Sequence, residues 1–234
     1  MKALRLIALI CLMLAPRFAA SENLPAALDP LENTSLPKLT VPEIRRETLN
    51  NGMRVLLLKD DELPVVRGYL YVATGEIYDP ADKVGLAELT AALLRGGGTE
   101  SLKPDQFDDQ LADLAAEIDI DMGREYALIS FKALKEDLPK VLGMLFDMLR
   151  HPAFDPQKLE LKRLQMMESL RRQNDNPMEI AGREFPKQIY GPDSVWARSP
   201  SAASIKSITR EDIVRHRLVQ EIVRCYEEGP HQKL

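Results

Sequence analysis

The sequence predicts an α+β fold, with helices packed on one face of an antiparallel β-sheet. Strand signals come in two groups, at 48–73 and at 117–133, and a block of helical segments follows each group. Neighbouring strands of this kind pair antiparallel, and helices that follow them in a block cover one face of the sheet. A parallel sheet needs strands that alternate with crossover helices, and the order of elements here does not show that alternation.

The composition indicates a folded, acidic protein. The 234 residues are 45% hydrophobic and 29% charged, which is enough apolar material for a core and too much for a disordered chain. The formal net charge is −5 and aromatic residues are 6%, so we do not expect the basic face or the stacking platforms of a nucleic-acid-binding protein. The three histidines, His151, His216 and His231, are too far apart for the helical zinc motif HExxH.

The first 21 residues are expected to be a signal peptide. A positively charged start precedes the apolar run 6–14, and small residues follow at 19–21, where a signal peptidase can cut. The run is shorter than the roughly 20 apolar residues that cross a bilayer, so we expect export to the periplasm or beyond, without a stable membrane anchor. A proline-punctuated segment, 22–46, is expected to form an extended arm. Cleavage would leave Cys225 as the single cysteine, which excludes an intrachain disulfide.

The strands are predicted from turn residues and from alternation of apolar and polar residues. Asn51-Gly52 is a strong hairpin signal and predicts two short strands within 48–58. The run 65–73 is rich in valine and tyrosine and predicts the next strand. Strict alternation predicts a half-buried strand at 117–122, which pairs with 125–133 through a short turn.

Helical periodicity predicts the remaining elements. The first helix starts at Leu86 and is stopped by the glycines at 96–98. The next starts at Pro104, with an apolar stripe at Phe107, Leu111, Leu114 and Ala115, and others are predicted over 138–149, 156–174 and 177–190. The helix at 156–174 is expected to pack through Leu159, Leu161, Leu164, Met167 and Leu170. Thr209 is the expected N-cap of a last helix.

A series of short segments identifies a family resemblance. They are Asn51-Gly52-Met53-Arg54-Val55, Pro80 through Val84-Gly85-Leu86-Ala87, Leu134-Lys135-Glu136-Asp137-Leu138, Leu149-Arg150-His151-Pro152-Ala153-Phe154, and Ser204-Ile205 leading to Ile208-Thr209-Arg210-Glu211-Asp212. In this order they resemble the insulinase/pitrilysin zinc metallopeptidases, which share a fold with the mitochondrial processing peptidase. The resemblance covers about 47–215 and implies an insulinase-like N-terminal α+β half-barrel. A full subunit of that family carries two homologous halves, and this chain is long enough for one.

The resemblance also locates the positions of the family's zinc site. Active members place a histidine directly after Gly-Leu-Ala, then two residues, a glutamate and a second histidine, which gives two zinc ligands and a general base on one helical turn. The matching positions here are Glu88, Ala91 and Ala92. The family's third ligand, a glutamate on a later helix, matches the neighbourhood of Glu168 and Ser169. Catalytic zinc normally has three protein ligands, so the resemblance implies an inactive homologue with no catalytic residue and no metal, although the family uses zinc.

One further group of acidic residues is considered as a cation site. Glu117, Asp119 and Asp121 lie on one face of the alternating strand, and their carboxylates are of the kind that binds hard cations. We interpret them as a solvated face, because the apolar residues of the same strand, at 118, 120 and 122, account for the alternation.

The favoured functional hypothesis is a non-catalytic subunit that pairs with an active zinc peptidase homologue, with a missing second half, or with both. Its surface would contribute to the binding of extended peptides, which add a strand to a sheet edge. The alternatives are a zinc-dependent metalloendopeptidase with a degenerate site and a truncated gene fragment. Beyond Arg215 the sequence departs from the family's pattern, so 216–234 is expected to be an atypical tail in which the family's closing strand is not recognisable.

Overall fold

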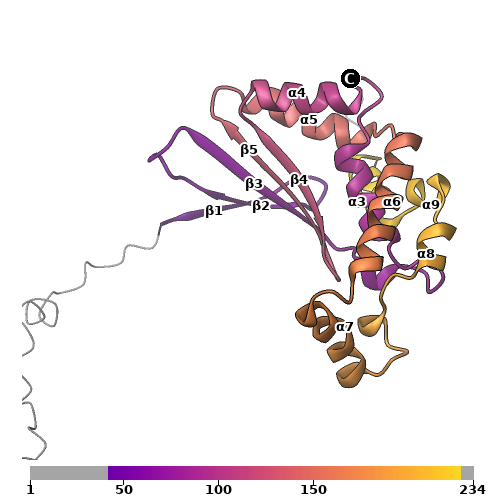
Figure 1. Cartoon of the computed structure of the whole chain (residues 1–234). Helices are drawn as coiled ribbons and strands as arrows, with labels where there is room; N and C mark the ends of the chain where they lie inside the picture. Colours follow the sequence, from indigo (N-terminus) through magenta and orange to yellow (C-terminus); the bar gives the residue numbers. More distant parts are fainter. Residues whose placement is uncertain (1–41, 228–234) are drawn as a thin grey trace, which may run out of the picture. The chain divides into compact units, whose positions relative to one another are not determined.

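A computed structural model describes residues 42–227 of the chain (Figure 1). The expected signal peptide, residues 22–41 of the expected arm and residues 228–234 of the tail lie outside the described residues. No helix within 42–227 is long and apolar enough to cross a membrane.

The strands form two antiparallel sheets. They are β1 (Ile44–Thr48), β2 (Arg54–Leu58), β3 (Val65–Val72), β4 (Glu117–Met122) and β5 (Ala127–Leu134). The hairpin β1-β2 is one sheet, and the other has the order β3-β5-β4. In the larger sheet Tyr69 is opposite Ser130, which is in turn opposite Asp119, so the open face carries rows of residues from all three strands.

Strand β1 begins at Ile44, so its first three residues belong to the segment 22–46 that was expected to be an extended arm. Ile44, Arg45 and Arg46 pair with Leu58, Leu57 and Leu56. The charged residues of β1 hide its strand character in the sequence, and only the pairing with the leucines of β2 defines it. The glycine of the predicted Asn-Gly turn, Gly52, has a φ of +81°, the left-handed conformation that such a turn requires.

The helices follow the two groups of strands. They are α3 (Leu86–Gly96), α4 (Pro104–Asp113), α5 (Leu138–Arg150), α6 (Pro156–Arg172), α7 (Pro177–Tyr190), α8 (Ala202–Ser207), α9 (Arg210–Val214) and α10 (Arg217–Glu227), with short 3-10 helices η1 (Glu76–Tyr78) and η2 (Val195–Ala197). Thr209 caps α9, since its side chain accepts a hydrogen bond from the N–H of Asp212. The predicted α+β class is confirmed.

The core lies between the larger sheet and the helices, which Figure 1 shows on one side of that sheet. Ile118 of β4 and Ile129 of β5 are buried, and they share the core with residues of α3, α4 and α5. Leu89, Leu93 and Leu94 of α3 are fully buried. The side chains that alternate with the buried ones on β4 point away from the helices and are exposed.

The predicted inner face of α6 is wrong in two positions. Leu161 is 47% exposed and Leu164 is 66% exposed, whereas Leu159 is buried as predicted. Arg163 lies on the inner side instead, and its Nη2 donates to the carbonyl oxygen of Ile208 at 2.6 Å. Leucines lie all round this helix, so their spacing alone does not select the face that packs.

The tail beyond Arg215 forms part of the folded unit. Residues 217–227 form α10, and Leu218, Val219 and Ile222 are buried in the main core. His216 joins α9 to α10 and is itself buried. The segment that departs from the family's sequence pattern therefore contributes apolar side chains to the same core as α3.

Candidate functional site

The site is centred on the first turns of α3, which a buried aspartate fixes in place. Asp79 is 2% exposed, and its carboxylate accepts hydrogen bonds from the backbone N–H groups of Gly85 at 2.9 Å and Ala87 at 3.0 Å. These N–H groups have no partner within the helix, and a negative charge there also complements the helix dipole. Gly85 has a φ of +103°, so the chain enters the helix through a conformation that favours glycine.

Glycine residues determine where α3 ends. The backbone N–H of Gly97 donates to the carbonyl oxygen of Leu93, and a Cβ on Gly97 would lie 2.4 Å from that oxygen. Gly98 follows with a φ of +74°. The glycines at 96–98 therefore end the helix, as the sequence predicts.

The three positions of the zinc motif lie on α3. By accessible area Glu88 is exposed, although protein around the pocket partly desolvates its carboxyl group. Ala92 is one turn further on the same face and half-buried, and Ala91 is buried. The alanine side chains end at Cβ and offer neither a lone pair for a metal nor a group that takes a proton from water. Of the three positions, only Glu88 carries a functional group.

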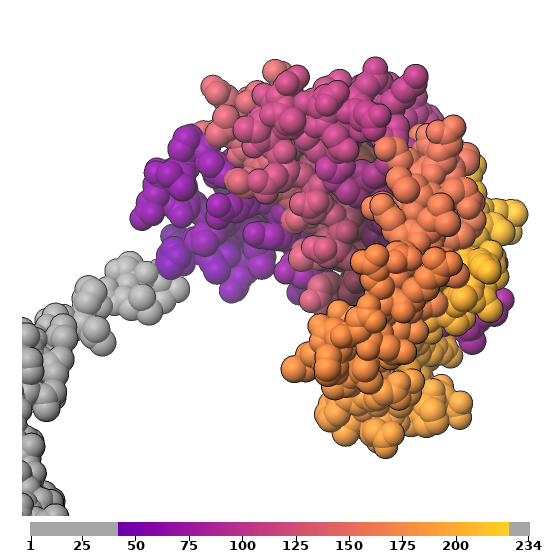
Figure 2. Space-filling model, in the orientation of Figure 1, coloured from indigo at the N-terminus to yellow at the C-terminus, as the bar shows by residue number. Residues whose placement is uncertain are grey.

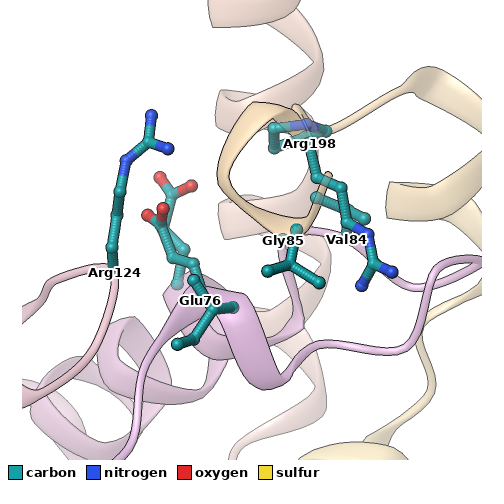
Figure 3. Close-up of a pocket in the computed structure, with 9 residues that line it drawn as sticks. Glu76, Val84, Gly85, Arg124 and Arg198 are labelled. Carbon is teal, nitrogen blue, oxygen red and sulfur yellow. The ribbon is translucent and has the colours of Figure 1, made fainter. Parts of the chain in front are cut away.

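A small pocket opens beside Glu88. Its volume is about 20 Å³, which is room for about one water molecule. Figure 3 shows the carboxyl groups inside it, with Arg124 on one side and Arg198 on the other. The lining residues are Glu76, Ile77, Val84, Gly85, Glu88, Arg124, Val195, Arg198 and Pro200.

The pocket raises the pKa of both of its carboxyl groups. Desolvation by the surrounding protein is the main cause for Glu88, and the negative charges of Glu76 and Asp79 add to it. Desolvation also raises the pKa of Glu76, against an opposing effect of the Arg124 guanidinium. Both carboxyl groups therefore hold protons more tightly than free glutamate does.

The arginines of the pocket are held by backbone carbonyl groups. Arg198 donates through Nη1 to the carbonyl oxygen of Asp79 at 3.2 Å, and Arg124 donates to that of Trp196. These bonds tie the segment around η2 to the N-terminal end of α3 and to the turn between β4 and β5. They make the pocket a junction of three distant parts of the sequence.

The residues at the third-ligand position lie on α6. Met166 approaches Gly85 at the start of α3, and Ser169, three residues further, lies on the same helix face. The carboxylate of Glu168 is bound instead by Arg172 at 2.9 Å and by Arg171 at 3.3 Å. The Arg172 hydrogen bond is the main reason that the pKa of Glu168 is lowered. Glu168 is thus engaged with its own helix.

The donor set does not fit a catalytic zinc ion. Within residues 42–227 no group of three or more histidine, cysteine, aspartate or glutamate side chains is arranged to hold a metal. Asp79, which is near Glu88, uses its oxygens on the helix N-terminus. Zinc catalysis by family rules needs three protein ligands and an adjacent base, and Glu88 is the single candidate ligand on α3.

Sequence reasoning missed several residues of this site. Glu76, Arg124 and Arg198 come from a 3-10 helix, a turn and a loop, and no local pattern marks them. His216 was placed in the atypical tail, yet its Nε2 lies 3.8 Å from Oδ1 of Asp79 and its Nδ1 accepts from the N–H of Leu218. An aspartate followed by proline a few residues before the helix was the available signal for Asp79.

Comparisons with known proteins agree with the fold. The profile of the Insulinase (Peptidase family M16) family matches residues 54–195. The chain is 23% identical over 182 residues to the mitochondrial-processing peptidase subunit beta of Dictyostelium discoideum, covering 74% of this chain and 37% of that protein. It is 24% identical over 153 residues to the uncharacterized zinc protease YmxG of Bacillus subtilis (strain 168), covering 65% and 37%.

Solved structures show the same fold. The peptidase M16 inactive domain from Pseudomonas fluorescens superposes with a TM-score of 0.68 at 24% identity, over 74% of this chain and 42% of that one. The α+β fold therefore belongs to the class of insulinase-type peptidase domains. This chain is a member of the insulinase family, peptidase family M16. It spans well under half the length of the relatives that it matches.

Proposed function

We propose that this chain is a non-catalytic member of the insulinase family that acts with an active zinc peptidase homologue outside the cytoplasm. The observation that carries the proposal is the content of α3, where Glu88, Ala91 and Ala92 stand at the positions of two ligands and the base. Without a base and a second ligand on this helix, no residue here generates a zinc-bound nucleophile.

Exposed apolar side chains support a role in association. Met178, Phe185 and Ile189 of α7 are 77%, 66% and 59% exposed, and the structure buries no residue of this helix. In Figure 2 the orange atoms of α6 and α7 form one side of a hollow whose other side is the sheet. A surface of this kind suits a partner domain or an extended peptide.

Export is the part of the proposal that rests on sequence alone. The charged start, the short apolar run and the small residues at 19–21 support cleavage near Ala20 or Ser21. Mass spectrometry of the protein from its native host would then find the mature N-terminus at that place. Retention of Met1 in cytoplasmic protein would overturn the export proposal.

The zinc-free proposal is tested by restoring the motif. The triple variant Glu88→His, Ala91→Glu, Ala92→His places two ligands and a base on one face of α3. Calorimetric titration with zinc should show weak or no binding to the wild type and clearly tighter binding to the variant. Peptide hydrolysis should stay low in both, because the third ligand position is not restored.

The matched control changes the same helix without adding ligands. Glu88→Gln, Ala91→Gln, Ala92→Gln enlarges the two alanine side chains, keeps the size of the side chain at position 88, and should leave zinc binding at the wild-type level. Tight stoichiometric zinc in the wild type, together with hydrolysis that a chelator stops, would contradict the proposal and support a degenerate but working metallopeptidase.

A further inference from the structure

A groove lies between α4 and α5, which Figure 1 shows beside each other on the helical side of the larger sheet. Its volume is about 540 Å³, which is within the range of sites that bind ligands. Each helix lines it with residues three or four positions apart, and such residues share one helix face. The groove has no lining residue in common with the pocket beside Glu88.

The floor of the groove is apolar. Met144 of α5 is buried in the core, and Leu102 and Leu114 are half-buried and pack against the same core. All three side chains also line the groove. An aliphatic side chain that enters it therefore exchanges water for carbon atoms, which is favourable in proportion to the area buried.

The groove is short. On α5 its lining residues run from Lys140 to Asp147, which is about 10 Å at 1.5 Å per residue. In an extended peptide, the side chains that face the same way belong to alternate residues, about 7 Å apart. The groove thus has room for one such side chain over its floor, with the next one on either side reaching its ends.

Gly143 leaves the middle of the α5 wall open. A Cβ at this position would meet nothing within 4 Å, so no neighbour in the chain excludes a larger residue. Glycine inside a helix is nonetheless less stable than alanine. A local rule that is broken without a gain for the fold is typical of a functional position. Here the glycine keeps the groove deep enough for a side chain from outside.

The α4 wall carries negative charge that the chain does not neutralise. This helix has four aspartates and no basic residue, and the first two aspartates form ion pairs with other helices. Within residues 42–227 the carboxylates of Asp109 and Asp113 have no ion-pair or hydrogen-bond partner. They are four positions apart, and Asp113 is in the last turn, where the helix dipole also disfavours an anion. A bound cation would relieve both effects.

Asp147 adds a fixed carboxylate at one end of the groove. Ser101 donates through Oγ to its Oδ2 at 2.7 Å, and Nδ1 of His151 lies 3.1 Å from its Oδ1. Desolvation would raise the pKa of Asp147, but the hydrogen bonds around it outweigh this effect and lower the pKa, so the charged form is favoured. Lys140 is the single basic residue of the lining, and its Nζ lies 3.7 Å from Asp137.

The charge of the groove indicates what it binds. Asp113 and Asp147 outnumber Lys140 in the lining, and Asp109 adds to the negative charge beside it. The complementary ligand has an aliphatic side chain for the floor and basic side chains for the two acidic positions.

We propose that the groove binds a short extended segment of a different polypeptide, in which a bulky aliphatic residue has a basic residue two positions away on each side. The aliphatic side chain lies over Gly143, and the basic side chains face Asp113 and Asp147. This interaction uses the helical side of the fold, and it stands or falls independently of zinc binding at α3.

The first test is an NMR titration of the full chain with a capped peptide of sequence lysine-serine-leucine-serine-lysine. The amide signals of residues 101, 113 and 143 should shift together with one Kd of about 1 mM, since the contact consists of one buried side chain and two exposed ion pairs. Absence of these shifts up to about 10 mM peptide would overturn the proposal.

Modified peptides test the two parts of the recognition. Replacing the leucine by alanine should weaken binding about fivefold or more, because most of the buried apolar area is lost. Replacing both lysines by glutamate should abolish the shifts. The proposal fails if either modified peptide binds as tightly as the original. It also fails if lysine amide alone does so, because the groove would then be a site for small cations.

A pair of glycine variants tests the depth of the groove. Gly143→Gln fills the open space and should weaken peptide binding about fivefold or more, while Tm rises because glutamine is a better helix former than glycine. Gly182→Gln in α7 is the matched control, since a Cβ there also meets nothing within 4 Å. It should raise Tm without a change in binding. Equal affinity of the two variants would contradict the proposal.

A second pair tests the charge. Asp113→Asn should weaken binding about two- to fivefold, as expected for an exposed ion pair. Asp193→Asn removes the same charge from a loop that does not line the groove, and should have no effect. Equal losses would show that only the net charge of the chain matters and would overturn the specific contact. The same shifts produced by concentrating the chain alone would identify a second copy as the occupant, against the proposal.

Discussion

At the scale of residues, two carboxyl groups near the start of α3 have different surroundings. Asp79 obtains the backbone N–H groups at the start of α3 and is satisfied although it is almost fully buried. Glu88 lies one turn further along the same helix and obtains no such partner among the described residues. Its carboxyl group is desolvated beside two other acids, which raises its pKa. Asp79 thus already accepts the hydrogen bonds that a carboxylate at the start of a helix usually accepts.

The raised pKa of Glu88 predicts a pH-dependent effect of Glu88→Gln. The folded protein binds this proton more tightly than the unfolded chain, so the stabilisation is present below the ordinary pKa of 4.5 and is lost as pH rises through the raised value. Glutamine removes a charge that is unfavourable at neutral pH. We expect the variant to raise Tm at about pH 7.5 and to leave it unchanged at about pH 4.

Glu168→Gln is the control with the opposite sign. Arg172 and Arg171 lower the pKa of Glu168, so its charged form is the favoured one in the folded state. Because the group is exposed, its loss should lower Tm only slightly at neutral pH. A lower Tm for Glu88→Gln at about pH 7.5 would contradict the raised pKa of Glu88.

Some residues of the site are identifiable from the sequence and others are not. Ala91 and Ala92 are identified from sequence because their positions follow a contiguous motif. Arg124 and His216 are not, because their contacts with Trp196 and Asp79 join positions far apart in the chain. Sequence patterns reveal the periodicity of a single helix or strand. Contacts between distant parts of the chain do not change that periodicity, so the patterns do not reveal them.

At the scale of elements, prediction succeeded where apolar and polar residues alternate strictly or where proline and glycine mark the ends of an element. The strand 117–122 and the helix 177–190 were predicted with the bounds that the structure has. The helix 156–174 was found, but the face that packs was partly wrong, because Leu161 and Leu164 are exposed while Arg163 is bonded to Ile208. A helix with leucines on several sides has no unique apolar stripe, so only its neighbours decide the face.

Helix α10 gives the sharpest element-scale prediction. Leu218 is fully buried in the core although it belongs to the segment interpreted from sequence as an atypical tail. Leu218→Ala removes buried apolar volume and should lower the free energy of unfolding by about 2–4 kcal/mol. Urea denaturation of the full chain, followed by circular dichroism, measures this difference.

Val223→Ala is the matched control in the same helix. Val223 is 37% exposed, so its truncation should change the free energy of unfolding by about 0.5 kcal/mol or less. Equal, small effects of the two substitutions would mean that α10 does not pack on the core in solution. The tail would then be dispensable for the fold.

At the scale of the whole chain, the described residues leave two kinds of surface available for association. The relatives named above are more than twice as long as the segment that matches this chain. Among the described strands, β2 and β3 each have one unpaired edge, and these edges and the exposed apolar residues of α7 lie on different elements. A sheet edge attracts other strands, and an apolar helix face attracts other apolar surfaces. Two separate surfaces therefore favour association by two separate routes.

This arrangement predicts that the chain, expressed alone, self-associates, and that the two routes are separable. Met178→Glu with Phe185→Glu places charges on α7, where both residues are largely exposed, and should reduce association without loss of fold. Leu56→Lys with Leu58→Lys protects the free edge of β2 in the manner of natural edge strands and should reduce it further. Sedimentation velocity at increasing protein concentration measures each step. Clean monomeric behaviour of the unmodified chain at high concentration, with a cooperative thermal transition, would contradict the view that these surfaces await a partner.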